Sequence, residues 1–132
     1  MSATDTQTTL RVRYAETDKM GVVYYANYLV WFEVARTEWL REHGWTYREM
    51  EAGGVMLPVI NAQCDYLRSV VYDEAVTLRT TGILHSPVRV EFTYEVLKED
   101  GTVAARGTTM HAAVDLHGRP CRLPERVLEV FQ

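Results

Sequence analysis

Asp18 is the side chain whose surroundings best suit chemistry in this sequence. It lies in a predicted loop over residues 15–26, which contains Gly21 and then an apolar, aromatic run leading into a helix. The first N–H groups of a helix have no partner within it, and together with the helix dipole they stabilise nearby negative charge. Such donors polarise a carbonyl group while a neighbouring carboxylate activates water or attacks the carbonyl carbon. This combination predicts a hydrolytic site, although Asp18 followed by Gly21 is equally typical of a simple turn.

Glu33 is a second candidate carboxylate, on the helix that follows. Arg36 lies three residues further on, so the two side chains are spaced for an ion pair on one helix face, at a contact between subunits. The alternative is a catalytic role for Glu33.

The histidines and cysteines predict neither a metal site nor a nucleophile. His111, Asp115 and His117 lie close together in sequence, but their spacing matches no zinc pattern. Cys64 shares a predicted strand face with the apolar Ile60, and we therefore assign it to the core.

Composition argues against several classes of function. A net charge of -4 and a pI of about 5.5 disfavour sequence-independent binding to nucleic acid, which requires a clustered basic face. The sequence contains no GxGxxG, Walker or GxSxG motif. No apolar stretch is long enough for a membrane span, and no signal peptide is visible at the start. Two distant cysteines outside any CxxC spacing are typical of reduced thiols, so we expect a cytoplasmic protein.

The clearest predicted element is a helix over residues 27–43. Asn27 is the expected N-cap, and Gly44 is the expected residue beyond the helix end. Apolar side chains cover most of the circumference and leave one narrow polar stripe. Because a surface helix has a much wider polar face, we expect this helix to be enclosed by a curved sheet and a partner subunit.

The later chain has the period-two pattern of strands. Residues 88–96 alternate apolar and polar side chains, and Asp100-Gly101 predicts a hairpin turn into a strand over residues 103–116. Pro58 indicates that a strand over residues 55–67 begins irregularly or lies at a sheet edge. The other predictions are strands over 11–14 and 74–84, short helices over 47–51 and 124–131, and a loose tail over 1–8.

These elements predict one α+β domain over residues 1–132. A strand, a long helix and then strands joined by hairpins favour an antiparallel sheet over a doubly wound fold. A sheet bent around the apolar helix satisfies both patterns, and the apolar surface left over favours a dimer.

A dense run of residues carries a specific family resemblance. It reads Arg13-Tyr14, Asp18, Gly21-Val22-Val23-Tyr24, Ala26-Asn27-Tyr28, Phe32-Glu33 and Ala35-Arg36. This run resembles the signature of the 4-hydroxybenzoyl-CoA thioesterase family, a hotdog-fold family that includes the acyl-CoA thioesterases associated with the Tol–Pal system. The similarity in element order extends over roughly residues 8–128.

The resemblance implies a fold and a reaction. The fold would be a hotdog: a five-stranded antiparallel sheet wrapped around a long central helix, in a homodimer that often pairs into a homotetramer. The reaction would be hydrolysis of an acyl-CoA thioester without a cofactor, because coenzyme A is part of the substrate. Asp18 matches the family's nucleophile or general base, and the backbone N–H near Tyr24 matches the group that polarises the thioester carbonyl.

Tyr25 departs from the family pattern, because many relatives have histidine at this place. Tyrosine hydroxyls ordinarily titrate near pH 10, so a tyrosine cannot replace that histidine in proton transfer at neutral pH. It can still donate a hydrogen bond to the substrate or to Asp18.

Coenzyme A would lie across the subunit interface, with its phosphates held by basic side chains. The phosphate candidates, chosen by their positions near strand ends, are Arg68, Ser69 and Arg89. The aromatic candidates for an acyl pocket are Tyr24, Tyr28, Phe32 and Tyr66, and Glu33 stays a candidate in the site.

Two other functions stay open. One is a hotdog domain that binds acyl-CoA without hydrolysing it. The other is a hotdog hydratase or dehydratase, but those enzymes usually depend on a histidine paired with a carboxylate, and no histidine lies beside Asp18 in sequence.

Overall fold

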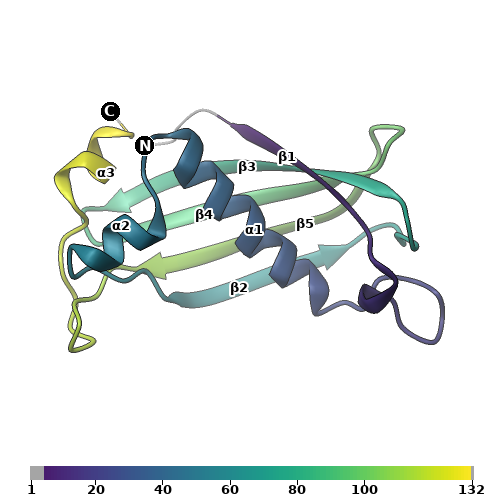
Figure 1. Ribbon diagram of the computed structural model, residues 1–132, viewed down its shortest axis with the longest axis horizontal. Coiled ribbons are helices and arrows are strands. Elements are labelled where there is room, and N and C mark those ends of the chain that lie inside the picture. Colours follow the sequence, from purple (N-terminus) through teal and green to yellow (C-terminus); the bar gives the residue numbers. More distant parts are fainter. Residues whose placement is uncertain (1–4, 132) are drawn as a thin grey trace.

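The computed structural model describes residues 5–131, and its central feature is a long helix lying on an antiparallel sheet (Figure 1). In chain order the elements are β1 (Thr6–Arg11), the short 3-10 helix η1 (Tyr14–Glu16), α1 (Asn27–Glu42), α2 (Tyr47–Ala52), β2 (Val59–Tyr66), β3 (Ala75–Ser86), β4 (Arg89–Leu97), β5 (Val103–Ala112) and α3 (Glu125–Glu129).

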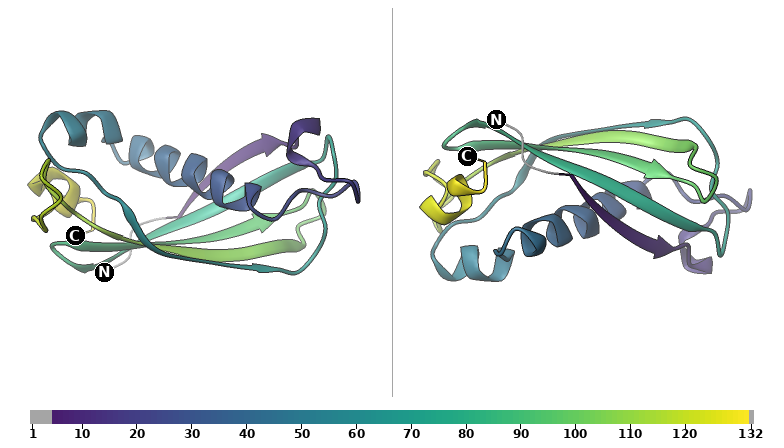
Figure 2. Two further views of the ribbon diagram at one scale, coloured as in Figure 1. Left: turned by 90° about the horizontal axis from the view of Figure 1, so that it is seen from below. Right: turned by 90° about the horizontal axis from the view of Figure 1, so that it is seen from above.

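The strands form a five-stranded sheet in the order β1-β3-β4-β5-β2, and every neighbouring pair is antiparallel. α1 lies along one face of this sheet, which twists and bends around it (Figure 2). α2 and α3 lie at one end of the sheet, and the loop between β1 and α1 lies at the other (Figure 1). The predicted hotdog architecture is therefore confirmed.

The core lies between α1 and the inner face of the sheet. On β4 the side chains of Val90, Phe92, Tyr94 and Val96 are buried, and the residues between them are more exposed, as the period-two pattern predicts. On α1 the ring of Phe32 stacks on Tyr94, with ring centroids 4.2 Å apart. These contacts fix which face of the helix points at the sheet.

Two glycines let α1 approach the sheet closely. A Cβ atom at Gly82 on β3 would overlap the indole of Trp39, and one at Gly107 on β5 would overlap the ring of Phe32. Glycine weakens a strand interior in isolation. Its presence at both positions is explained by the two aromatic rings that lie directly above.

The first strand differs from its prediction. β1 runs over Thr6–Arg11 rather than residues 11–14, and residues 14–16 form η1. The predicted loose tail is therefore wrong for residues 6–8, whereas residues 1–4 lie outside the described part of the chain. β1 pairs with β3 at the sheet edge, where Thr6 is buried and Gln7 is exposed. Its polar composition reflects one exposed face, and threonine suits a strand because it is β-branched.

The start of α1 also differs in detail. The predicted N-cap, Asn27, is the first helical residue, and the cap position is held by Ala26 without a side-chain hydrogen bond. The Asn27 amide instead donates to the Glu16 carbonyl at 2.8 Å. The other end is as predicted, because Gly44 directly follows the C-cap His43 and has a positive φ of 84°.

The remaining predicted elements are present with shifted ends. β2 and β5 are shorter than the predicted runs over 55–67 and 103–116, while α2, β3 and β4 agree within two residues. The hairpin between β4 and β5 turns at Gly101, which has a φ of 86°. β2 follows Pro58, lies at a sheet edge and has a register shift between Val59 and Asn61, which confirms the expectation drawn from the proline.

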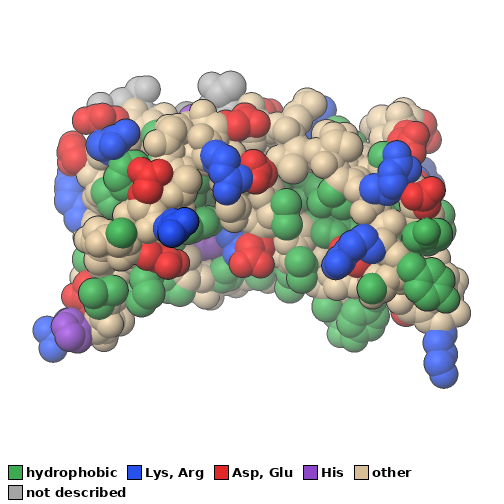
Figure 3. Space-filling view, in the orientation of Figure 1, with side chains coloured by type: hydrophobic (Ala, Val, Ile, Leu, Met, Phe, Trp, Pro, Cys, Tyr) green, Lys and Arg blue, Asp and Glu red, His purple; other side chains and the backbone are tan. Residues whose placement is uncertain are grey.

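Apolar side chains stay exposed on one side of the molecule. Most residues of β2 are exposed on both strand faces, and Leu29, Val30 and Val34 on α1 are 41%, 47% and 40% exposed. Figure 3 shows hydrophobic side chains reaching the surface along the lower part of this view, over α1 and β2. The predicted enclosure of α1 is therefore only half provided by its own sheet.

No helix within residues 5–131 is long and apolar enough to cross a membrane.

Candidate active site

Asp18 lies in a tight turn between η1 and α1. Its N–H donates to the Val22 carbonyl at 2.9 Å, and the Gly21 N–H donates to its carbonyl at 2.9 Å. Gly21 has a φ of 80°, a conformation that glycine adopts without steric cost. The Asp18 Oδ1 atom accepts the Met20 N–H at 2.8 Å. Asp18 therefore does form the turn, but this uses one carboxylate oxygen and leaves the other available.

The pairing beyond the turn determines which backbone N–H groups are free at the helix entry. The Tyr24 N–H donates to the Glu16 carbonyl at 2.9 Å. The next two N–H groups, of Tyr25 and Ala26, donate to no backbone or side-chain acceptor in the part of the chain that the structure describes. The free donor near Tyr24 is therefore the N–H of the following residue, Tyr25.

Asp18 lines a pocket of about 290 Å³ at the entry of α1. The other predicted site residues that line this pocket are Tyr25, Tyr28, Tyr66, Arg68 and Ser69. The remaining wall is largely apolar and consists of Met20, Val22, Val23 and Leu67. The structure therefore brings together residues from the loop, the first turn of α1 and the end of β2.

Tyrosines form the aromatic wall of the pocket. Tyr66 packs edge to face against Tyr25 and Tyr28, with ring centroids 6.3 and 5.0 Å apart, and its hydroxyl donates to the Tyr25 carbonyl at 3.0 Å. Burial raises the pKa of Tyr28 to about 12, and burial together with the neighbouring Cys64 raises the pKa of Tyr66 to about 12. Both hydroxyls are therefore protonated at neutral pH and are able to donate a hydrogen bond.

Arg68 is the basic residue that lines the pocket, and Lys98 contacts its neighbour Ser69. Arg68 is exposed and has no carboxylate within ion-pair distance among residues 5–131. Lys98, which the sequence did not single out, donates to the Ser69 carbonyl at 2.8 Å and pairs with Glu74 at 3.4 Å. Lys98 and Ser69 are far apart in sequence and meet only through tertiary packing, so no local sequence pattern predicts their contact.

Tyr24 and Glu33 are not in the pocket wall. Tyr24 is 45% exposed and packs against Tyr25, whose hydrogen bond is the main cause that raises the Tyr24 pKa. Glu33 lies further along α1, in a separate groove between this helix and β2 that Arg36 also lines. The predicted ion pair between Glu33 and Arg36 does not form within the described chain, since no ion pair joins them at 4 Å or less.

Arg89 lies far from the pocket within this chain. It is the first residue of β4 and pairs with Ala112, near the end of β5. The pocket lies at the opposite end of the sheet, where Tyr66 of β2 pairs with Ala105. Arg89 was chosen as a residue near a strand end, but strand ends occur on both sides of a sheet.

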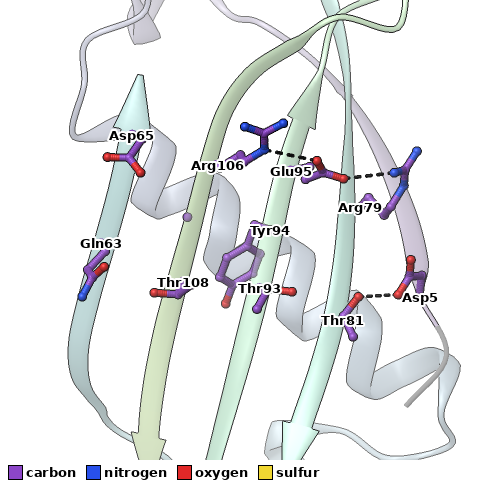
Figure 4. A pocket seen from close by; sticks show the side chains of 11 residues that line it. Asp5, Gln63, Asp65, Arg79, Thr81, Thr93, Tyr94, Glu95, Arg106 and Thr108 are labelled. Atoms are coloured by element: carbon purple, nitrogen blue, oxygen red, sulfur yellow. Dashed lines mark hydrogen bonds and ion pairs between the residues drawn. The ribbon is translucent and has the colours of Figure 1, made fainter. Parts of the chain in front are cut away.

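A different hollow lies on the outer face of the sheet, away from α1 (Figure 4). Its main charges are paired with each other, because Glu95 accepts from Arg79 at 3.0 Å and from Arg106 at 3.4 Å. None of the predicted site residues lines it. This hollow offers no arrangement comparable to the carboxylate and free N–H groups at the entry of α1.

Within residues 5–131 no group of three or more His, Cys, Asp or Glu residues is placed to hold a metal ion. Cys64 and Cys121 are free thiols. His111 is fully buried, and its ring nitrogens lie 3.0 Å from the Leu57 carbonyl and 2.8 Å from the Thr109 hydroxyl. Both nitrogens of this histidine therefore have partners inside the protein.

Known proteins share both the sequence and the fold. Residues 12–131 match the family model described as the thioesterase-like superfamily. YneP of Bacillus subtilis is 37% identical over 106 residues, covering 80% of this chain and 77% of that protein. The acyl-CoA thioesterase YbgC of Haemophilus influenzae is 30% identical over 124 residues, covering 92% and 90%. A crystal structure of a DHNA-CoA thioesterase from Staphylococcus aureus is 35% identical, has a TM-score of 0.92, and the match covers 96% and 88% of the two chains.

The family model covers residues 12–131, and the structural match covers 96% of the chain. This protein belongs to the thioesterase-like superfamily of hotdog proteins.

Proposed function

We propose that this protein is an acyl-CoA thioesterase, which hydrolyses an acyl-CoA to a free acid and coenzyme A. The thioester carbonyl accepts the free Tyr25 N–H at the helix entry, which stabilises the developing oxyanion. The free oxygen of Asp18 activates water as a general base or attacks the carbonyl carbon as a nucleophile. No cofactor is required, because coenzyme A is part of the substrate.

The observation that carries this proposal is the convergence of Asp18 and a partnerless backbone N–H in one pocket. The names of relatives point to the same reaction, since YbgC is named an acyl-CoA thioesterase and the Staphylococcus aureus neighbour a DHNA-CoA thioesterase. A hydratase or dehydratase is less well supported, because no histidine is among the residues that line this pocket.

The remaining parts of the proposal concern substrate binding. Tyr25, Tyr28 and Tyr66 contact the acyl group and the thioester, and Arg68 with the Ser69 hydroxyl binds a phosphate of coenzyme A. Tyr24, Glu33 and Arg89 can take part only from outside this pocket, for example across a contact between subunits. We place the enzyme in the cytoplasm as a homodimer or homotetramer.

The test is thiol release from a panel of acyl-CoAs by the wild type and by Asp18→Asn. Asparagine keeps the size and accepts the Met20 N–H through its amide oxygen, so the turn is preserved while the base or nucleophile is lost. We expect the rate to fall at least about 100-fold, with an unchanged melting temperature.

Two results would contradict the proposal. Release that is unaffected by Asp18→Asn removes Asp18 from the mechanism. Tight binding of acyl-CoA by the wild type without thiol release from any substrate favours a domain that only binds acyl-CoA.

A further inference from the structure

Glu16 is a buried carboxylate at the end of η1, two residues before Asp18, and only 6% of its surface is exposed. Its Oε2 atom accepts the indole N–H of Trp31 at 2.8 Å, and its Oε1 atom accepts the Arg13 N–H at 2.8 Å. Trp31 lies on the second turn of α1 and is itself buried. The Glu16 side chain therefore ties the segment before the loop to the helix after it.

The main chain of Glu16 makes a second connection to the same region. Its carbonyl accepts the Tyr24 N–H at 2.9 Å and the Asn27 side-chain amide at 2.8 Å. The bond from Tyr24 removes one N–H from the helix entry, so the first free donor is that of Tyr25. Asp18 follows Glu16 by two residues, on the same short segment that pairs with residues 22–24.

We infer that Glu16 is a positioning residue, which fixes the distance between the Asp18 carboxylate and the free N–H groups at the start of α1. This inference rests on the proposed function, because Glu16 would position the two groups that the proposed reaction uses. Asp18 lies in the turn after η1, and the free N–H groups of Tyr25 and Ala26 lie directly before α1. Among the described residues, Glu16 bonds both to the segments on either side of this turn and to α1, through its side chain and its carbonyl.

Glu16 acts through other groups and does not touch the substrate. Each carboxylate oxygen already accepts an N–H, and the side chain does not line the pocket that contains Asp18. The groups around the two oxygens are all donors: the backbone N–H of Arg13, the Trp31 indole and the Arg13 guanidinium, whose Nε atom lies 3.6 Å from Oε1. Positioning matters for rate, since a displacement of about 1 Å in a reacting group can cost about 100-fold.

The first variant is Glu16→Gln, which keeps the side-chain size. Its amide has one acceptor oxygen and two N–H donors, so one N–H must face either the Trp31 indole or the Arg13 backbone N–H, and the ion pair with the Arg13 guanidinium is lost as well. The loop and the helix then shift relative to each other. We expect kcat for the best acyl-CoA substrate to fall about 10- to 100-fold while KM changes by less than about threefold.

A matched control removes a buried hydrogen bond elsewhere. Tyr94→Phe loses the bond between the Tyr94 and Thr109 hydroxyls, 2.6 Å apart, without changing the stacked ring. This variant is expected to lose melting temperature but to keep kcat. An equal fall of kcat in Glu16→Gln and Tyr94→Phe at the same loss of melting temperature would show a purely structural role and overturn the inference.

A double-mutant cycle tests the connection to the helix. Trp31→Phe removes the indole donor, so in the double variant the side-chain amide introduced by Glu16→Gln no longer opposes an N–H at that position. We expect the two effects on kcat to be non-additive, with the double variant no slower than Glu16→Gln alone. Additive effects would mean that Glu16 does not act through Trp31.

One readout does not depend on turnover. In the wild type the Tyr24 amide is hydrogen-bonded to Glu16 and should exchange slowly with deuterium, whereas the Tyr25 amide should exchange fast. Glu16→Gln should raise the Tyr24 exchange rate at least about tenfold while amides of β4 keep theirs. Unchanged Tyr24 exchange overturns the inference even if the wild type hydrolyses no acyl-CoA. Loss of activity in Asp18→Asn with normal kcat in Glu16→Gln refutes the role of Glu16 alone.

Discussion

At the scale of single residues, the proposed function gives the Asp18 carboxylate a catalytic role in addition to its role in the turn. One oxygen accepts the Met20 N–H and holds the turn, and this bond also fixes the rotamer of the side chain. Asp18 lines the same pocket as Tyr25 and Tyr66, and its other oxygen has no hydrogen-bond partner among residues 5–131. The turn interpretation and the catalytic interpretation of Asp18 are therefore compatible, because preorganising the carboxylate is part of what a catalytic site needs.

His111 carries a charge-dependent contribution to stability. The Leu57 carbonyl can only accept, so the His111 Nδ1 atom carries the hydrogen and Nε2 accepts from the Thr109 hydroxyl. Burial is the main cause that lowers the pKa of His111 to about 4. The folded protein therefore holds this ring neutral at pH values where the unfolded chain protonates it.

We expect the free energy of unfolding to depend on pH through His111. Above pH 6.5 the ring is neutral in both states, and between about 6.5 and 4 only the unfolded state binds the proton, so stability falls as the pH falls. A shift from 6.5 to about 4 corresponds to about 3 kcal/mol. Chemical denaturation of the wild type and of His111→Gln across this range checks it. Plotted against pH, the unfolding free energies of the two proteins should converge toward pH 4. Parallel plots would exclude His111 as the cause of the pH dependence.

At the scale of elements, the sequence predicted well the segments whose apolar residues follow a clear strand or helix period. In β4 buried and more exposed residues alternate, and in α1 the buried residues recur at helical spacing. Both elements pack against a common core, which confirms the predicted strand and the predicted helix. Residues 6–8 of β1 are predicted as a tail, because an edge strand rich in threonine shows little apolar alternation. The pocket residues Asp18 and Tyr25 lie close in sequence and were also predictable. The contacts of Glu16 with Trp31 and of Lys98 with Ser69 are tertiary, and no local pattern encodes them.

The fit of α1 on the sheet makes a prediction for β5. Gly107→Ala places a Cβ against the Phe32 ring and the Gln63 backbone, neither of which can move without disturbing the core. We expect a loss of about 2–4 kcal/mol in the free energy of unfolding by urea. Gly101→Ala is the comparison, since its Cβ meets open space and only the positive φ is unfavourable. It should cost about 1 kcal/mol. A cost for Gly107→Ala no larger than that of Gly101→Ala would contradict the close approach.

At the scale of the whole molecule, the side formed by α1 and β2 is incomplete in one chain. β2 is an edge strand with unpaired backbone groups along its outer side, and Val59 and Ile60 are 43% and 50% exposed. The exposed Leu29 and Val30 of α1 line the groove between α1 and β2, together with Val59. An exposed apolar edge of this kind is a liability for a monomer unless another chain covers it. A second copy that pairs along β2 would also bring its own side chains close to the Asp18 pocket, whose wall includes Tyr66 at the end of that strand.

This arrangement predicts that a charged side chain introduced on β2 both separates the subunits and lowers the rate of thiol release. In sedimentation velocity at micromolar concentration the wild type should run as a dimer or larger, and Ile60→Lys should run as a monomer. The matched control is Leu116→Lys, because Leu116 is 67% exposed and lies in the turn after β5. It should keep the wild-type assembly and the wild-type rate of thiol release.

If Ile60→Lys becomes monomeric and retains full activity, then the pocket is complete within one chain and dimerisation serves only to cover the apolar edge. A wild type that is monomeric at micromolar concentration would instead remove the dimer from the proposal and leave the exposed residues of α1 and β2 for another partner.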